Sequence, residues 1–407
     1  RSNKTDQLKG LLLQYFTESE ISLITRKLSI HKKRDEKWFN RFKSADKKQL
    51  LLQPATLDRV RIDLLLTFAE NKLENPRFVD LLINLSNIAS NYGEITLAIE
   101  LNQLAFQKSN RQEALADFAA HALLAMGIIS SNQALWKETT DYILKAKKYF
   151  NKSKNTKGII KCENLLGALY AETGKLKKAE AHLQKCLSLL NNQKDKALAG
   201  MIEVNLGIIN NIKGNFDIAF SFFQRALTRF EQLADVKRIA EIRHNLGMVF
   251  TKKKEYHSAL VEFDLSLTAS YEVNNLPTMG MTYLSKAFLY TELKDFYLAE
   301  ALADKAMEIC YKVNDRLSIA EVYKIKGIIH RNFGNSEYAE NYLLTSLRLN
   351  KELNNDLNFA ETSYEMGLLY SEWKKADQAQ IHFATAIKYY SKIGAVHDAE
   401  NVKELLE

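Results

Sequence analysis

Small and bulky residues alternate along this chain with a fixed period of 40 residues. One column of small residues consists of Gly127, Gly167, Gly207, Gly247, Ala287, Gly327 and Gly367, and an earlier copy, Ser86, lies 41 residues before Gly127. Twelve residues after Gly207 stands a second small residue, Ala219, followed four residues later by Phe223 and seven residues later by Ala226. Small residues let antiparallel helices approach closely, and bulky residues on the same helical face fill the space beside them. The pattern predicts about eight helical hairpins.

Turn and capping signals recur with the same period. Glycine suits the left-handed backbone that ends a helix, and it stands in the expected hairpin turns at Gly93, Gly174, Gly214 and Gly334, whereas lysine replaces it at Lys254, Lys294 and Lys374. Predicted N-caps or turn formers precede each new hairpin at Asn155, Asp195, Asp235, Asn275, Asp315 and Asn355. Each repeat therefore comprises a helix A, a turn, a longer helix B and a polar joint.

The composition is that of a chain that is helical nearly throughout, with 46% apolar residues and only three prolines. The spacing from Leu206 to Ala226 resembles the tetratricopeptide repeat family in a 40-residue form, although Lys286 and Lys326 replace buried aliphatic residues of that family. The resemblance implies an all-α, right-handed superhelical solenoid. We expect an amino-terminal helical region at 1–75, followed at 76–407 by repeats over 76–115, 116–155, 156–195, 196–236, 237–276, 277–316, 317–356 and 357–407.

The amino-terminal region does not align with the repeat. It carries helical patterns around 8–16 and 57–73, and Thr17 with Glu20 forms a predicted capping box. It either caps the first hairpin or forms a separate small bundle. Residues 1–75 hold 16 basic and 10 acidic residues, and a basic patch is expected at Lys32, Lys33, Arg34, Lys37 and Arg41. Such a patch beside aromatic residues contacts nucleic acid or an acidic protein, or is simply a solvated helix face.

Motifs for catalysis are missing from the sequence: there is no phosphate-binding loop, dinucleotide fingerprint, zinc-protease helix or nucleophile elbow. The eight histidines are scattered, and Cys162, Cys186 and Cys310 have no CxxC spacing. We therefore expect no enzyme activity, cofactor or metal, and reduced thiols in a cytoplasmic protein. No signal peptide is recognisable, no apolar run approaches the roughly 20 residues of a membrane span, and nothing specifies an oligomeric state.

The inside of the predicted superhelix offers a polar surface. Residues near the small column of helix A are expected to line it and to contact a partner, namely Asn164, Asn205, Asn211, His244, Asn245, Lys324, Arg331 and Tyr364. A side-chain amide both donates to and accepts from an extended peptide backbone. The alternative is that these asparagines only tie one hairpin to the next. Families with the same Asn-Leu-Gly repeats use the asparagine for peptide contact, which the resemblance carries over to Asn205 and Asn245.

Three functions are consistent with these features. The first is a scaffold or adaptor that binds a peptide or protein segment along the concave face. The second is a signalling or transcription regulator, because a basic helical region before 40-residue repeats resembles in architecture the bacterial Rap family and the sensor portions of larger regulators. In those families a peptide bound in the repeats alters the amino-terminal helices. The third is an enzyme or nucleic-acid binder that uses the basic patch.

Overall fold

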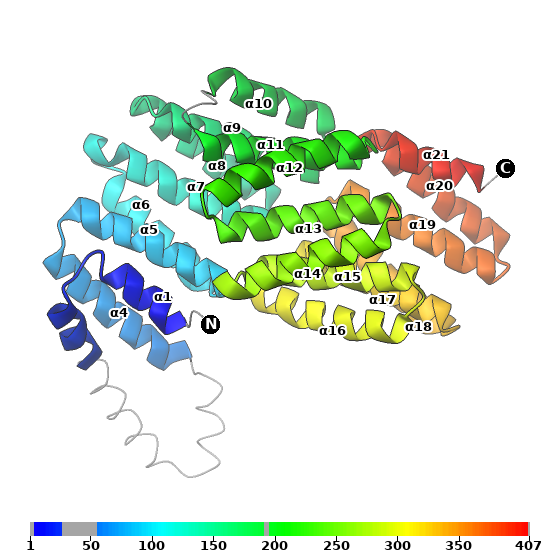
Figure 1. The fold of residues 1–407 in the computed structure, drawn as a ribbon, viewed down its shortest axis with the longest axis horizontal. Helices are drawn as coiled ribbons and strands as arrows, with labels where there is room; N and C mark the ends of the chain where they lie inside the picture. Colours follow the sequence, from blue (N-terminus) through cyan, green and yellow to red (C-terminus); the bar gives the residue numbers. More distant parts are fainter. Residues whose placement is uncertain (1–3, 27–54, 191–194, 406–407) are drawn as a thin grey trace, which may run out of the picture.

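The computed structural model describes residues 4–26, 55–190 and 195–405. Within these ranges, the helices from α5 to α20 form eight consecutive antiparallel hairpins (Figure 1). The odd-numbered helix of each hairpin is its helix A, and the even-numbered helix is its helix B. Each helix also packs against the next hairpin along the chain. The predicted all-α solenoid is confirmed.

The helices of the described residues have regular lengths and are separated by short turns. Their bounds are α1 Lys4–Leu12, α4 Ala55–Lys72, α5 Asn75–Asn91, α6 Ile95–Ser109, α7 Ala116–Asn132, α8 Trp136–Lys152, α9 Thr156–Glu172, α10 Leu176–Leu189, α11 Lys196–Ile212, α12 Phe216–Gln232, α13 Val236–Lys252, α14 Tyr256–Val273, α15 Leu276–Glu292, α16 Phe296–Val313, α17 Arg316–Asn332, α18 Ser336–Glu352, α19 Asp356–Glu372, α20 Ala376–Ile393 and α21 Val396–Glu404. Residues 18–26 are also helical, and a short 3-10 turn, Glu113–Leu115, precedes α7.

The column of small residues lies where helix A crosses helix B of the same hairpin. A Cβ atom on Gly247 would stand only 2.4 Å from the ring of Phe263, which is completely buried. In the next hairpin the column holds Ala287, and the facing position holds the small Ala303 in place of a bulky residue. A larger residue in the small column is therefore matched by a smaller facing residue on helix B, and the distance between the crossing helices can stay short.

The polar joints cap the A helices largely as predicted. A side-chain oxygen accepts a hydrogen bond from a backbone N–H in the first helical turn at Asn155, Asp235, Asp315 and Asn355. The other two joints use their side chains differently. Asp195 pairs with Lys157 at 2.6 Å, and the amide of Asn275 donates to the Thr278 hydroxyl at 2.6 Å. Capping satisfies amides that have no partner within the helix.

The amino-terminal helices pack against the first hairpin. They share one hydrophobic core with α5 and α6, which includes Leu11, Phe16, Ile24, Leu65, Phe78, Leu82 and Leu101. The Tyr15 hydroxyl donates to Asp80 at 2.5 Å and accepts from the amide of Asn84 at 2.8 Å. The Thr17–Glu20 capping box forms, with reciprocal hydrogen bonds of 3.0 and 3.4 Å. These helices thus cover the apolar end of the solenoid.

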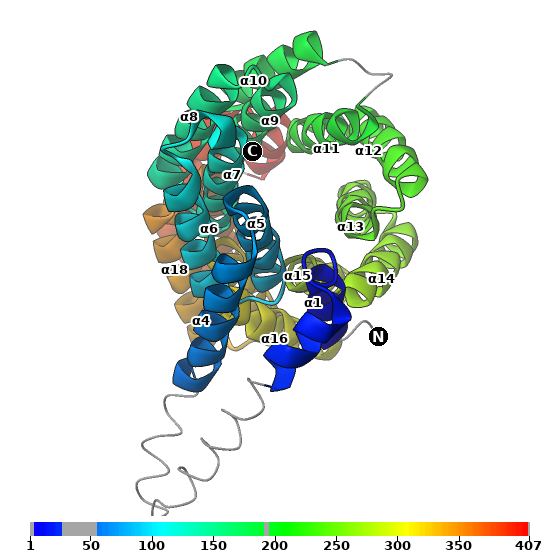
Figure 2. The same ribbon diagram turned by 90° about the vertical axis from the view of Figure 1, so that its left-hand side faces the viewer.

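The superhelix closes on itself after about six repeats, and Figure 2 shows its helices arranged around a centre. The A–B turns of the first four hairpins meet the ends of later helices along a contact that we call the seam. One side of the seam comprises Gly93, Trp136, Gly174 and Gly214, and the other comprises Lys312, Leu353, Ile393 and His397.

One stretch of the described residues, Glu113–Asn132, has the length and mean hydropathy (1.5) of a membrane span, which the sequence analysis missed. It contains α7, and 61% of its most apolar 18-residue window is buried inside the solenoid. A helix A of a repeat has neighbours on several sides, so an apolar composition is expected of it.

Candidate functional site

Each helix A presents one sector to the interior of the superhelix. At 3.6 residues per turn, the positions six and two residues before the small column, and one and five after it, fall within roughly 60°. Side chains at these positions are at least partly exposed from α7 to α19, except Ile325 and Ile328. Positions on one side of the sector are buried at Ile202 and Ile209 in α11, and positions on the other side are buried at His244 and Thr251 in α13. Figure 2 places helices A around the centre and helices B outside them. We call this sector the inner face.

Three kinds of side chain recur on the inner face. Amides lie two residues before the small column at Asn205 and Asn245. An apolar column follows one residue after it and consists of Ile128, Ile208, Met248, Phe288, Ile328 and Leu368. Carboxylates flank this column in two rows, formed by Glu241, Glu321 and Glu361 on one side and by Glu172, Glu292 and Glu372 on the other. The inner face is therefore an apolar stripe between two rows that contain several carboxylates, with a lysine in each row at Lys161 and Lys252.

The two inner-face asparagines have different surroundings. The Asn205 amide donates to the side-chain oxygen of Asn164 at 2.9 Å, which links α11 to α9. Asn245 makes no side-chain hydrogen bond within the described residues, so its amide remains available to a ligand. Asn211 lies between neighbouring helices, and its buried amide oxygen has no partner among the described residues. Asn245 and Asn205 are the predicted contact residues that reach the inner face.

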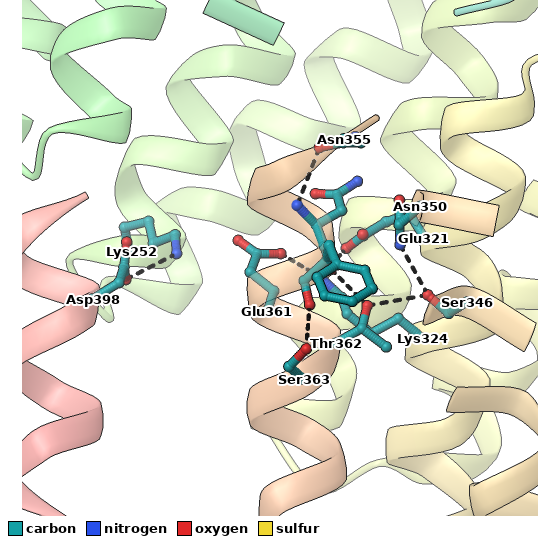
Figure 3. Close-up of polar contacts among 12 residues, drawn as sticks. Lys252, Glu321, Lys324, Ser346, Asn350, Asn355, Glu361, Thr362, Ser363 and Asp398 are labelled. Atoms are coloured by element: carbon teal, nitrogen blue, oxygen red, sulfur yellow. Dashed lines mark hydrogen bonds and ion pairs between the residues drawn. The ribbon is translucent and has the colours of Figure 1, made fainter. Parts of the chain in front are cut away.

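Lys324 lies at the centre of a buried charge cluster between α17 and α19 (Figure 3). Its ammonium group is 2.6 Å from Glu321 and is also paired with Glu361. Burial opposes the charge of Lys324, but the two carboxylates outweigh burial and raise its pKa. Burial raises the pKa of Glu321, whose second carboxylate oxygen has no hydrogen-bond partner among the described residues. Lys324 thus holds two helices together and is not exposed to a ligand.

Charges also face one another across the interior. Lys252, at the end of α13, lies 3.9 Å from Asp398 of α21. Figure 3 shows this pair beside the Lys324 cluster. Burial favours the neutral form of Glu361, but Lys324 and Lys252 together lower the pKa of this carboxyl. Burial raises the pKa of Asp398 in spite of the nearby Lys252. Helices that are far apart in the sequence therefore share one electrostatic environment.

A second inter-helix cluster surrounds Arg331. Its guanidinium donates to Glu365 at 2.8 Å and lies 3.5 Å from Glu372. Burial raises the pKa of Glu365 although Arg331 opposes that change. Tyr364 packs against the ring of Phe383, with 6.1 Å between the ring centroids. The predicted residues Lys324, Arg331 and Tyr364 are thus brought together, but at the packing interface between α17, α19 and α20.

His244 must be corrected as a contact residue. Its side chain is 8% exposed, lies against Phe263 and is 3.4 Å from the Thr282 hydroxyl. Burial lowers its pKa to about 4, so the ring is neutral at pH 7. The physical reason is angular: a residue three before the small column points toward the neighbouring helices, about 100° away from the residue two before it.

The apolar column and the two rows of carboxylates were not predicted from the sequence. Their signal was available, because Met248, Phe288 and Leu368 recur with the same 40-residue period as the glycines. The predicted basic patch at Lys32, Lys33, Arg34, Lys37 and Arg41 lies outside the described residues.

The three cysteines are free and buried. Burial raises the pKa of Cys162, Cys186 and Cys310 to about 12 in each case, so their thiols are protonated at pH 7. Among residues 4–26, 55–190 and 195–405, no group of three or more His, Cys, Asp and Glu side chains has an arrangement suited to a metal ion.

Two segments match family models of the tetratricopeptide repeat, at residues 198–270 and 164–192. The chain therefore contains tetratricopeptide repeats, as the resemblance in the sequence implied. No curated protein matches the sequence.

Solved structures extend the likeness to most of the chain. A Rap protein in complex with competence and sporulation factor is 14% identical, with a TM-score of 0.58 over 90% of this chain and 98% of that one. The Rap conjugation gene regulator of plasmid pLS20 in complex with the Phr* peptide is 15% identical, with a TM-score of 0.59, covering 79% and 97%. Aspartyl phosphate phosphatase F from Bacillus subtilis is 14% identical, with a TM-score of 0.52, covering 92% and 94%. At such identities the likeness establishes the fold.

Proposed function

We propose that this protein binds an extended polypeptide segment on its inner face. The observation that carries the proposal is the partly exposed amide of Asn245, three residues before the apolar side chain of Met248 on the same helical face, an arrangement repeated one hairpin earlier at Asn205 and Ile208. The amides would bind the backbone of the segment, and the apolar stripe would bind its apolar side chains.

The chemistry of the inner face restricts the occupant. Carboxylates flank the apolar stripe, and Glu172 and Glu292 are exposed at its edge. Burying an acidic side chain against them would cost free energy through repulsion. We therefore expect a segment with apolar side chains and without net negative charge. The likeness to Rap proteins solved with a factor and with a Phr* peptide supports a peptide as the occupant.

A second candidate is a regulator in which the bound segment acts on the amino-terminal helices. The observation that favours it is the hydrogen-bonded link from Tyr15 to Asp80 and Asn84 in α5. Asn84 holds the same repeat position as Asn205 and Asn245. A change at the first hairpin would therefore reach the amino-terminal region directly.

Peptide selection tests the proposal. Peptides selected from a displayed random library on the wild-type chain should bind the double variant Asn205→Ala/Asn245→Ala at least about tenfold more weakly, since each lost hydrogen bond costs about 1 kcal/mol. The matched control is Asn341→Ala, an exposed asparagine on the outer helix α18. Equal affinity for the wild type and the double variant would contradict binding at these residues.

The proposed role is binding without catalysis, in the cytoplasm, and it requires no nucleic acid, cofactor or metal. Measured turnover of an acyl phosphate by the purified chain would contradict the non-catalytic role. Binding of random DNA that weakens steeply with salt would point to the basic patch instead.

A further inference from the structure

The seam is built on glycines that the next turn of the superhelix touches. A Cβ atom on Gly174 would lie 2.4 Å from Ile393, and one on Gly93 would lie 3.0 Å from the carbonyl oxygen of Lys312. A Cβ atom on Gly214 would lie 3.2 Å from the Cβ of His397. Any larger residue at Gly174 would push the two sides of the seam apart.

Later turns of the same type are free of this constraint. Gly334 has the same left-handed backbone (φ +73°) as Gly174 (φ +70°), yet a Cβ atom there would meet nothing within 4 Å. Lys254, Lys294 and Lys374 adopt φ values of 57 to 63° at equivalent turns. The backbone conformation alone therefore does not require glycine. Contact with the next turn of the superhelix explains its presence at Gly174.

Polar and aromatic contacts join the two sides of the solenoid. The indole N–H of Trp136 donates to the carbonyl oxygen of Leu353, 217 residues away. Phe216 meets the ring of His397 edge to face, with 6.2 Å between the centroids. The Lys237 ammonium donates to Asn91 at 2.9 Å across 146 residues. The seam therefore rests on a few separate contacts.

No hydrophobic core cluster of the described residues crosses the seam. Each cluster joins helices that are neighbours along the chain, such as the one from Ala339 to Val402 and the one from Ile160 to Ile209. In a solenoid, stability comes from such neighbouring contacts. The seam can therefore part through small rotations between repeats, while every core stays intact.

We propose that the seam is a gate that controls lateral access to the inner face. This inference rests on the proposed binding of a polypeptide there. A closed seam makes the inner face continuous around the superhelix, so that an internal segment of a larger protein enters only when the seam parts. A small molecule reaches the inner face in either state.

A chemical probe on the inner face tests the gate without any bound polypeptide. Ser285 lies two residues before the small column on α15 and is partly exposed, so Ser285→Cys provides one reactive thiol. The three native thiols are buried and protonated. The measurement is the rate of reaction with N-ethylmaleimide, and with a maleimide carried on a small globular protein. The ratio of the reaction rate with the bulky reagent to the rate with the small reagent reports opening of the gate.

Gly174→Asn should raise this ratio about tenfold, because its side chain cannot fit against Ile393. Gly334→Asn is the matched control, with the same substitution at nearly the same φ but in open space, and should leave the ratio unchanged. Trp136→Phe removes the indole donor and keeps a ring, and should raise the ratio several-fold.

Equal rate ratios in the wild type and in the folded seam variants would overturn the proposal that the seam is a gate. Equal increases in both glycine variants would also overturn it, because backbone strain would then be the cause. Circular dichroism establishes folding, and Trp136→Phe decides the question if Gly174→Asn does not fold. Failure of peptide selection would contradict the proposed function but would leave these ratios unaffected.

Discussion

The effect of Gly247→Ala on the free energy of unfolding is predicted to depend on the residue at position 263. The substitution should destabilise the protein when Phe263 is present and stabilise it when alanine replaces Phe263. The added methyl group would lie 2.4 Å from the Phe263 ring, far inside ordinary contact distance, and the ring is completely buried. Overpacking of this kind costs about 1–3 kcal/mol. Replacing glycine by alanine inside a helix contributes about 1 kcal/mol in the opposite direction. The net prediction is a loss of about 0–2 kcal/mol in the free energy of unfolding.

Removing the ring should reverse the result. In the Phe263→Ala background nothing opposes the methyl group, so Gly247→Ala should stabilise the protein by about 1 kcal/mol. The chain already contains this pair at Ala287 and Ala303. The expected coupling between the two sites is therefore about 1–3 kcal/mol.

Urea unfolding of the wild type, the two single variants and the double variant measures this coupling, and hydrogen exchange in α13 and α14 locates it. The comparison of backgrounds matters more than the absolute loss, because Phe263→Ala alone costs about 3–5 kcal/mol. If Gly247→Ala had the same effect in both backgrounds, compensation of size at the helix crossing would be refuted.

Three further predictions concern polar groups at contacts between helices. Lys324→Met should cost about 3–5 kcal/mol in urea unfolding because it leaves two carboxylates without their cation, whereas Lys326→Met, which breaks a pair with the exposed Asp304, should cost less than about 1 kcal/mol. Equal losses would contradict the burial argument. His244 has a pKa of about 4 when folded and 6.5 when unfolded, so its stabilising effect is complete above pH 6.5. About 3 kcal/mol of it is lost as the pH falls to about 4, and His244→Gln should flatten the stability profile in that window. Tyr15→Phe should increase hydrogen exchange in α1, because it removes the hydroxyl that joins Asp80 to Asn84, and unchanged exchange would contradict this link.

The repeat and its helix boundaries could be predicted because close packing imposes residue size at fixed spacing. Even the breaks in the pattern follow this rule. In the first hairpin Asn102 replaces the bulky residue, and its amide donates a hydrogen bond to Ser86, which stands in the small column. Residues that compensate for each other in this way lie at fixed spacing in one hairpin, so the compensation can be recognised from the sequence alone.

The orientation of site residues was harder to predict. Positions that differ by one residue point about 100° apart on a helix, so His244 lies in the core while Asn245 is partly exposed. The seam was not predictable from the repeat, because contacts such as Trp136–Leu353 depend on small rotations summed over six hairpins. The difference between Gly174 and Lys374, which occupy equivalent turns, was a weak indication of the seam. The turn at Gly174 touches the next superhelical turn, whereas the turn at Lys374 does not.

Photo-cross-linking from the inner face tests the central claim most directly. A photoreactive residue is placed at Met248 on the inner face, or at Ile218, an exposed apolar residue on the outer helix α12. Each protein is irradiated with a peptide selected on the wild-type chain. The binding proposal predicts a cross-linked peptide at position 248 and none at position 218. Cross-linking at 218 alone would contradict recognition by the inner face.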